Sequence, residues 1–202
     1  VDGSNYIVES ANTYIISGPG YYRIPLVYGN GVKNNNVNNG SYYTTINNYY
    51  SLQNLTDHLD NPIHTPYINQ QNNANPAVQA STVWMDYPNM VENSTLHIKN
   101  YGGVDFVEFQ IKKENIQNGN AVIAVKDRNG VVMWSWQLWF TTRDALDVIP
   151  CTNQQGVVYK FTKYTLGYTQ RNLATTYNQP RQVRVTIEQT VGNNHTKQVA
   201  QT

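Results

Sequence analysis

The sequence has few charges, a single cysteine and no long hydrophobic run, and each shortage narrows the classes of protein to which it belongs. Only 13% of its 202 residues are charged and the formal net charge is +1, so it offers no basic surface for nucleic acid or anionic lipid. Cys151 has no second cysteine with which to form an internal disulfide. No apolar run approaches the roughly 18–20 residues of a transmembrane helix, and no signal peptide opens the chain. We therefore expect no nucleic-acid partner and no transmembrane segment.

Residue patterns typical of catalytic and metal sites are missing as well. No GxSxG, P-loop or GxGxxG motif occurs, and the four histidines show neither HxxxH nor HxH spacing. Cys151 needs a histidine partner to act as a nucleophile, and we expect a partly buried, inert thiol instead. A glycosidase needs two carboxylates across a cleft. Four carboxylates are candidates, but their spacing does not support such a pair: Asp105, Glu108, Asp144 and Asp147. The sequence predicts no catalytic residue, no cofactor and no metal ion.

Short strands separated by turn residues account for most of the chain. Residues 104–111 and 182–189 alternate apolar with polar side chains, as strands with one buried face do. Pro, Gly and Asn interrupt nearly every window long enough for a helix. Further strands are expected at 14–16, 22–28, 121–125, 131–140, 157–161 and 196–202. This pattern predicts an all-β fold, an antiparallel β-sandwich of immunoglobulin- or transthyretin-like character.

Residues 119–140, GNAVIAVKDRNGVVMWSWQLWF, indicate one long β-hairpin. Its turn is expected at Asn129-Gly130, a pair that favours type I′ geometry with positive φ at both residues. After the turn, strand alternation places Trp134 and Trp136 on one face, which we expect to be core, and Trp139 on the other. The hairpin is therefore expected to anchor the domain through its large apolar side chains.

Residues 30–80 differ from the rest because they are rich in Asn and Tyr. We expect them to be a loop-rich insertion within a single sandwich domain of residues 1–202, with at most one short helix at 52–59, where leucines recur at i, i+3 and i+7. Tyrosines on polar loops bind sugars and protein surfaces, because a flat apolar ring ends in a hydrogen-bonding hydroxyl. The ligand-binding candidates are Tyr42, Tyr43, Tyr49, Tyr50 and Tyr67. The alternative, that these rings fasten the loop to the sandwich, stays open.

Four sequence blocks, taken together, resemble a known family. They are ANTYIISGPGYY at 11–22, PLVYGN at 25–30, GNAVIAVKD at 119–127 and MWSWQLWF at 133–140. In this order they look like a domain of the fimbrillin-like surface proteins of Bacteroidetes, a group that includes tip and accessory subunits of type V pili. Residues 58–68, 83–86, 166–168 and 181–189 also look similar to that group, so the likeness covers most of the chain in order.

Two positions depart from the pattern of that family. Gln137 stands where the pattern WSWHxW has a histidine, and Tyr168-Thr169 stands where Trp-Cys is common. The first departure argues against a metal or catalytic role at position 137. The second removes a possible partner for Cys151 and leaves its thiol unpaired.

The resemblance implies an exported, often lipid-anchored protein built of β-sandwich domains, and we expect this chain to be the C-terminal part of a longer precursor. The expected function is that of a non-enzymatic adhesion or pilus-tip module at the cell surface, on the outer membrane or the fimbrium. Expected partners are other pilus subunits or surface proteins, and a host or bacterial glycan or protein ligand. Two alternatives stay open: a carbohydrate-binding module of a surface glycan-uptake system, and a secreted hydrolase.

Overall fold

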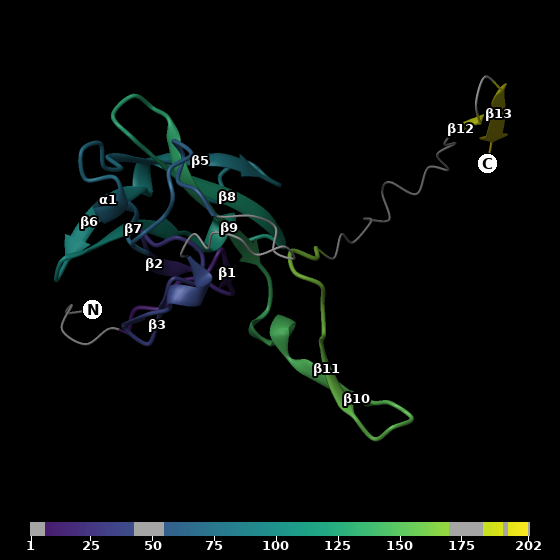
Figure 1. Ribbon diagram of the computed structural model, residues 1–202, viewed down its shortest axis with the longest axis horizontal. Helices are drawn as coiled ribbons and strands as arrows, with labels where there is room; N and C mark the ends of the chain where they lie inside the picture. The colour runs from purple at the N-terminus through teal and green to yellow at the C-terminus, as the bar shows by residue number, and fades with distance from the viewer. Residues whose placement is uncertain (1–6, 43–54, 170–183, 192–193, 202) are drawn as a thin grey trace. The chain divides into compact units, whose positions relative to one another are not determined.

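The computed structural model describes residues 7–42, 55–169, 184–191 and 194–201 (Figure 1). The chain divides into two compact units, residues 1–169 and residues 170–202. In the second unit the described residues form one antiparallel hairpin of β12 (Arg184–Val191) and β13 (Asn194–Gln201). The two strands expected at 182–189 and 196–202 are therefore present, with slightly different ends.

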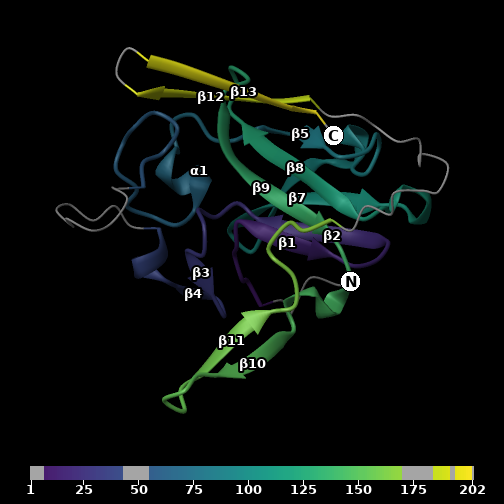
Figure 2. The same ribbon diagram turned by 90° about the vertical axis from the view of Figure 1, so that its right-hand side faces the viewer.

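In the first unit, two sheets pack on each other as a β-sandwich (Figure 2). One sheet has four strands in the order β1 (Thr13–Ile16), β9 (Val132–Phe140), β8 (Gly119–Lys126) and β5 (Gln79–Met85). The other has three strands in the order β2 (Gly20–Pro25), β7 (Val104–Ile111) and β6 (His97–Tyr101). Neighbouring strands are antiparallel, except that β1 runs parallel to β9 with Thr13 opposite Gln137. The all-β, sandwich-like fold predicted from the sequence is confirmed.

The core between the two sheets is built from alternate residues of their strands. In β7, Val107, Phe109 and Ile111 are buried whereas Gln110 is partly exposed, as the alternation predicts. Trp136 of the opposite sheet is 1% exposed and belongs to the same buried cluster. Since burying a large apolar side chain contributes about 1.5–3 kcal/mol, this cluster is what holds the sheets together.

The β8–β9 hairpin turns between Asp127 and Val131, but not with the geometry that its sequence predicts. Gly130 has a φ of 80° and Asn129 is not among the described residues with positive φ, so the predicted type I′ turn is wrong. The Gly130 N–H donates to the Asp127 carbonyl oxygen at 3.0 Å, the pattern of a longer loop closed by a glycine bulge. The Asp127 carboxylate explains the change, because its Oδ1 accepts hydrogen bonds from the N–H groups of Asn129 at 2.9 Å and Val131 at 2.8 Å.

The tryptophans of β9 lie where alternation predicts, with one local break. A bulge opposite Val125–Lys126 leaves Met133 as an extra residue, and its side chain is buried as well. Trp134 packs against the core, edge-on to Tyr28, with ring centroids 5.1 Å apart. The core role expected of Trp134 and Trp136 is thus confirmed.

The Asn- and Tyr-rich segment carries only short elements in its described residues. They are β3 (Val32–Lys33), β4 (Asn36–Val37), the 3₁₀ turn η1 (Asn39–Ser41) and α1 (Ile68–Gln71). Of the helix expected at 52–59, residues 52–54 lie outside the described part and residues 55–59 are not helical. Asp57 makes a turn there instead, because its Oδ1 accepts hydrogen bonds from the N–H groups of Leu59 and Asn61, both at 2.9 Å.

The described residues of the first unit also form three further 3₁₀ turns and one projecting hairpin. The turns are η2 (Asn93–Thr95), η3 (Lys113–Asn115) and η4 (Arg143–Leu146). The hairpin pairs β10 (Val148–Thr152) with β11 (Val158–Thr162) and extends away from the sandwich in both views (Figures 1 and 2). The sequence predicted β11 but not β10. In the described part of the chain, none of the helices has the length and apolar character that a membrane span requires.

Replacing Trp136 by Ala is expected to lower the free energy of unfolding by about 3–5 kcal/mol, because loss of the ring leaves a cavity between the sheets. Urea titration followed by far-UV circular dichroism measures this change. Val132→Ala, at an exposed position of the same strand, is the control and should change the stability by less than about 0.5 kcal/mol. Equal losses in the two variants would contradict a core position for Trp136.

Candidate functional site

The tyrosines that the sequence singles out are not gathered into one described site. Tyr42 is 4% exposed and belongs to the core cluster, so its ring packs inside the fold. Tyr67 is partly buried against a small cluster that includes Val8 and Phe106. Tyr43, Tyr49 and Tyr50 lie outside the described residues. A ligand role for these three therefore stays a prediction, whereas the placement of Tyr42 and Tyr67 agrees with the alternative that such rings fasten the loop.

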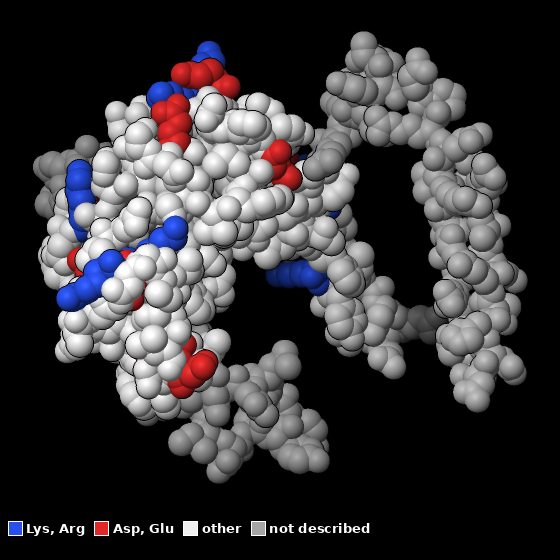
Figure 3. Space-filling view, turned by 90° about the horizontal axis from the view of Figure 1, so that it is seen from above, with Lys and Arg blue, Asp and Glu red and all other residues white. Residues whose placement is uncertain are grey.

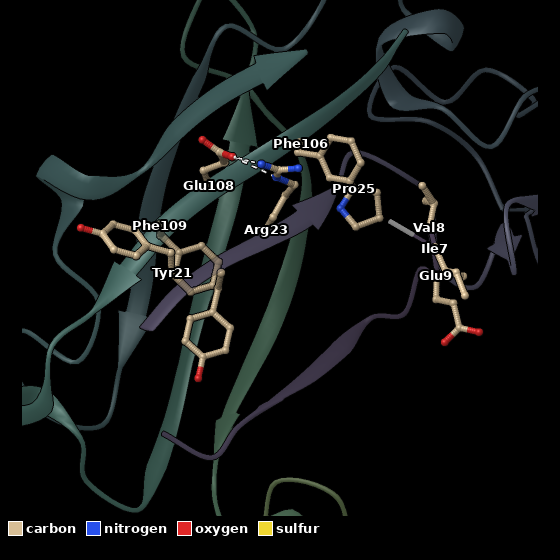
Figure 4. Close-up of a pocket in the computed structure, with 10 residues that line it drawn as sticks. Ile7, Val8, Glu9, Tyr21, Arg23, Pro25, Phe106, Glu108 and Phe109 are labelled. Carbon is tan, nitrogen blue, oxygen red and sulfur yellow. Dashed lines mark hydrogen bonds and ion pairs between the residues drawn. The ribbon is translucent and has the colours of Figure 1, made fainter. Parts of the chain in front are cut away.

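A groove of about 460 Å³ lies on the outer side of the β2–β7–β6 sheet, next to residues 7–9 (Figure 4). Strand alternation places its residues there. Tyr21 and Arg23 project to this side of β2, whereas Ile24, the residue after Arg23, is buried in the core. The strand register sets Arg23 opposite Glu108 of β7. Phe106, 3% exposed, supplies the apolar floor of the groove.

Glu108 is the centre of a charge network beside the groove. Its Oε1 accepts from Arg23 Nη2 at 2.8 Å, from Arg23 Nε at 2.9 Å and from the Tyr101 hydroxyl at 2.7 Å, and its Oε2 pairs with Lys99 Nζ at 3.0 Å. The Arg23 guanidinium lies over the Tyr101 ring, 3.7 Å from its centroid. Burial alone would raise the pKa of Glu108, but the hydrogen bonds from Tyr101, Lys99 and Arg23 outweigh it and hold that pKa below its usual value. The carboxylate is therefore a fixed anion with its donors already in place.

Tyr21 is a strongly exposed residue of this groove. Its side chain is 84% exposed, and Figure 4 shows the ring turned away from the sheet, while Arg23 points toward Glu108. Across the groove, Glu9 extends its carboxylate outward (Figure 4). An open groove with a flat ring at its rim, an apolar floor and fixed charges suits a sugar ring or an apolar side chain of another protein.

Sequence reasoning did not single out this groove, although one signal pointed to it. The sequence already places Glu108 on the outward side of the strand at 104–111, and Tyr21 alternates with core-facing residues in the same way. The sequence pattern does not reveal that β2 pairs with β7, and only this pairing brings Arg23 and Glu108 together. Alternation predicts the face of each residue, and the strand register decides which residues meet.

Five carboxylates of the described chain have pKa values that differ from the ordinary value. Each of the five whose pKa is displaced has a lowered pKa: Asp57, Glu92, Glu108, Asp127 and Asp144. The ion pair with Lys163 lowers the pKa of Asp144 the most, to about 2. A general acid needs a raised pKa, so these five are unsuited to that role. In the part of the chain that the structure describes, no three His, Cys, Asp or Glu side chains come together as metal ligands.

A series of hydrogen bonds links Gln137 and its neighbours to residues 167–168. Gln137 Nε2 donates to Asn120 Oδ1 at 2.8 Å, and Asn120 Nδ2 donates to the Gly167 carbonyl oxygen at 3.0 Å. Trp139, fully buried on the non-core side of β9, donates its Nε1–H to the Tyr168 carbonyl oxygen at 2.8 Å. These bonds fasten residues 167–168 to the sheet, so Gln137 has a structural role here.

Cys151 lies on the β10–β11 hairpin and is exposed, so the partly buried thiol expected from the sequence is wrong. The reason is that every residue of both hairpin strands is exposed. On the face shown in Figure 3, acidic and basic side chains are scattered among uncharged ones, in keeping with the 13% of charged residues. The charge network of Glu108 is therefore a local concentration on a surface that is mostly uncharged.

Comparison of the chain with models of protein families, with curated protein sequences and with solved structures finds no match.

Changing Glu108 to Gln is expected to lower the free energy of unfolding by about 1 kcal/mol at pH 7, because a neutral amide no longer balances Arg23 and Lys99 at this partly buried position. Since the fold lowers the pKa of Glu108, its charge stabilises the protein above the ordinary glutamate value of about 4.3, and this contribution is lost as the pH falls through the lower pKa of the folded state. Urea unfolding between pH 7 and pH 3 should show the difference between wild type and variant shrinking in acid.

The control for this titration is Glu114→Gln, at an exposed position on η3. It should leave the stability unchanged at both ends of the range. A Glu108→Gln difference that stays constant down to pH 3 would show that the charge of Glu108 does not stabilise the fold.

Proposed function

We propose that this chain is a non-enzymatic cell-surface protein that acts as an adhesion or tip module of a fimbria and holds its ligand in the groove beside Tyr21. One observation carries the proposal: a cavity of about 460 Å³ combines an exposed ring, an apolar floor and a fixed ion pair on a rigid sheet. Binding sites are typically concave, largely apolar and equipped with a few placed polar groups. The resemblance of the sequence to fimbrillin-like surface proteins supports the cellular setting.

The groove is arranged to bind without rearranging. Glu108 already accepts hydrogen bonds from three side chains, and Arg23 is held between Glu108 and the Tyr101 ring. Groups that are fixed before a ligand arrives lose little conformational entropy when it binds. Tyr21 then supplies the flat apolar contact, and its hydroxyl reaches beyond the rim as a hydrogen-bonding tip.

A carbohydrate-binding module of a glycan-uptake system is the second candidate, and one observation favours it. An exposed tyrosine beside a charged pair is suited to a sugar, whose ring face is apolar and whose hydroxyls need polar partners. Both candidate functions use the same groove, and they differ in where on the cell the protein is found. The hydrolase alternative draws no support from the five carboxylates with lowered pKa values.

The cellular part of the proposal is tested by locating the native protein in the bacterium that produces it. An antibody raised against this chain should label intact cells and should detect the protein in sheared fimbriae. Label on the surface without any in the fimbrial fraction would favour the glycan-uptake module. Detection in the cytosolic fraction alone would overturn both.

Tyr21→Ala is expected to weaken ligand binding by at least roughly tenfold, since tyrosines are enriched among the few residues that carry most of the affinity of a binding site. The measurement is saturation binding of the purified chain to a glycan array and to immobilised surface proteins. Trp84→Ala removes an aromatic side chain that is also exposed but lies on β5 of the other sheet, and it should bind as the wild type does. Binding that survives loss of Tyr21 would place the ligand site elsewhere.

A further inference from the structure

The β10–β11 hairpin carries an apolar face that the groove does not use. Strand alternation and the register, which pairs Ile149 with Phe161 and Cys151 with Tyr159, put these four side chains on one side. Val157, next to β11, continues this side opposite Asn153. We call the set Ile149, Cys151, Val157, Tyr159 and Phe161 the apolar face. It bears no charge, whereas Lys160 projects from the opposite side of the hairpin.

This apolar face is open to solvent although its residues are of the kind that proteins bury. Its aliphatic and aromatic side chains are between 47% and 58% exposed, and Cys151 is exposed as well. A two-stranded hairpin is only marginally stable by itself in water and gains stability when an apolar face is covered. Contiguous apolar patches rimmed by polar residues mark protein contact sites.

We propose that two copies of this chain associate by stacking the apolar faces of their β10–β11 hairpins across a two-fold axis. The face offers on the order of 500 Å² per copy, given the roughly 150–250 Å² that one aromatic side chain can bury. Two faces together then bury on the order of 1,000 Å², the lower bound for a specific interface. Because the face has no charge, stacking it on itself brings no like charges together. The inference concerns a different surface from the groove and does not depend on the proposed function.

The edges of the hairpin favour stacking over strand addition. The N–H of Asn153 donates to the Val157 carbonyl oxygen, and the N–H of Lys163 donates to the Asp147 carbonyl oxygen. The backbone groups of odd-numbered residues in β10 therefore bond to β11, whereas those of even-numbered residues point to the free edge of the hairpin. Pro150 therefore stands at an outward position of β10, where it removes a donor from the free edge. On β11, Lys160 is the central residue whose backbone groups point to the free edge. A symmetric strand pairing centred on Lys160 would place it opposite Lys160 of the second copy, and like charges directly opposite each other destabilise a sheet.

Cys151 makes the association measurable without an added label site. It lies in the middle row of the apolar face, opposite Tyr159, so a two-fold axis through that row brings the two thiols near each other. Stacked sheets lie about 10 Å apart, which a short bismaleimide spans. The full chain should therefore form a covalent dimer with this reagent, at a yield that rises with protein concentration. Sedimentation equilibrium should show a species of twice the 23.0 kDa mass of one chain.

Matched variants decide which surface is used. Phe161→Glu and Val158→Glu add the same charge to the same strand at 58% and 55% exposed positions, but on opposite sides of the hairpin. Phe161→Glu should weaken dimerisation at least roughly tenfold, as loss of an aromatic anchor does, while Val158→Glu should not. Ile149→Glu, on the other strand of the apolar face, should act like Phe161→Glu. The fluorescence of the core tryptophans reports whether each variant is folded.

Three results would overturn the inference. The first is a chain that stays monomeric and uncross-linked at millimolar concentration. The second is equal weakening by Phe161→Glu and Val158→Glu in folded protein. The third is a dimer that is lost on Lys160→Pro but kept on Phe161→Glu. Lys160→Pro removes a backbone N–H at the free edge of β11, so this result would place the contact at the strand edge. The Tyr21→Ala variant should dimerise normally, which separates this surface from the groove.

Discussion

The register of β8 against β9 is the constraint on which the rest of the structure depends. Ile123 lies opposite Trp136, and Ala121 lies opposite Leu138, so smaller side chains of one strand leave room for larger ones of the next. A slip by one residue would move every side chain of the strand to the other face and expose Trp136. Since β9 also pairs with β1 and β8 with β5, all four strands of the sheet take their positions from this hairpin.

The second sheet links this core to the candidate site. Tyr22 stacks on Phe109 inside the sandwich, with ring centroids 5.6 Å apart and the rings 14° from parallel. That contact fixes the orientation of β2, and the same orientation turns Tyr21 and Arg23 outward. Tyr22 and Phe109 also line the groove, so contacts of the core and residues of the groove occur side by side on these strands. The groove is therefore built on two strands that the core holds in place.

The sequence predicted the strands in which buried and exposed residues alternate regularly. It failed where a single side chain, or a contact between residues far apart in the sequence, determines the local structure. Residues 104–111 alternate and form β7 as predicted. At Asp127 and Asp57, by contrast, a carboxylate that accepts backbone hydrogen bonds overrides the turn or helix that the neighbouring residues favour. β10 was missed because Pro150 interrupts its pattern, although an edge strand tolerates proline at an outward position. The groove requires the pairing of β2 with β7, information that no local pattern contains.

Gln137 and the segment at Tyr168 are far apart in the sequence but lie close together in the fold. A β-carbon on Gly167 would lie 2.8 Å from Gln137 Nε2, so the side chain at 137 and the segment beside Tyr168 must fit each other in size. Asn120 bridges them, and the Tyr168 carbonyl oxygen accepts from a tryptophan of the same strand as Gln137. Residues 167–168 also lie where the chain returns to the sandwich after the β10–β11 hairpin. Before the hairpin, the buried side chain of Ala145 anchors the chain at the point where it leaves the sandwich. A hairpin fixed at both ends can keep an apolar face open to solvent without folding back, because its anchors, and not its own burial, hold it in place.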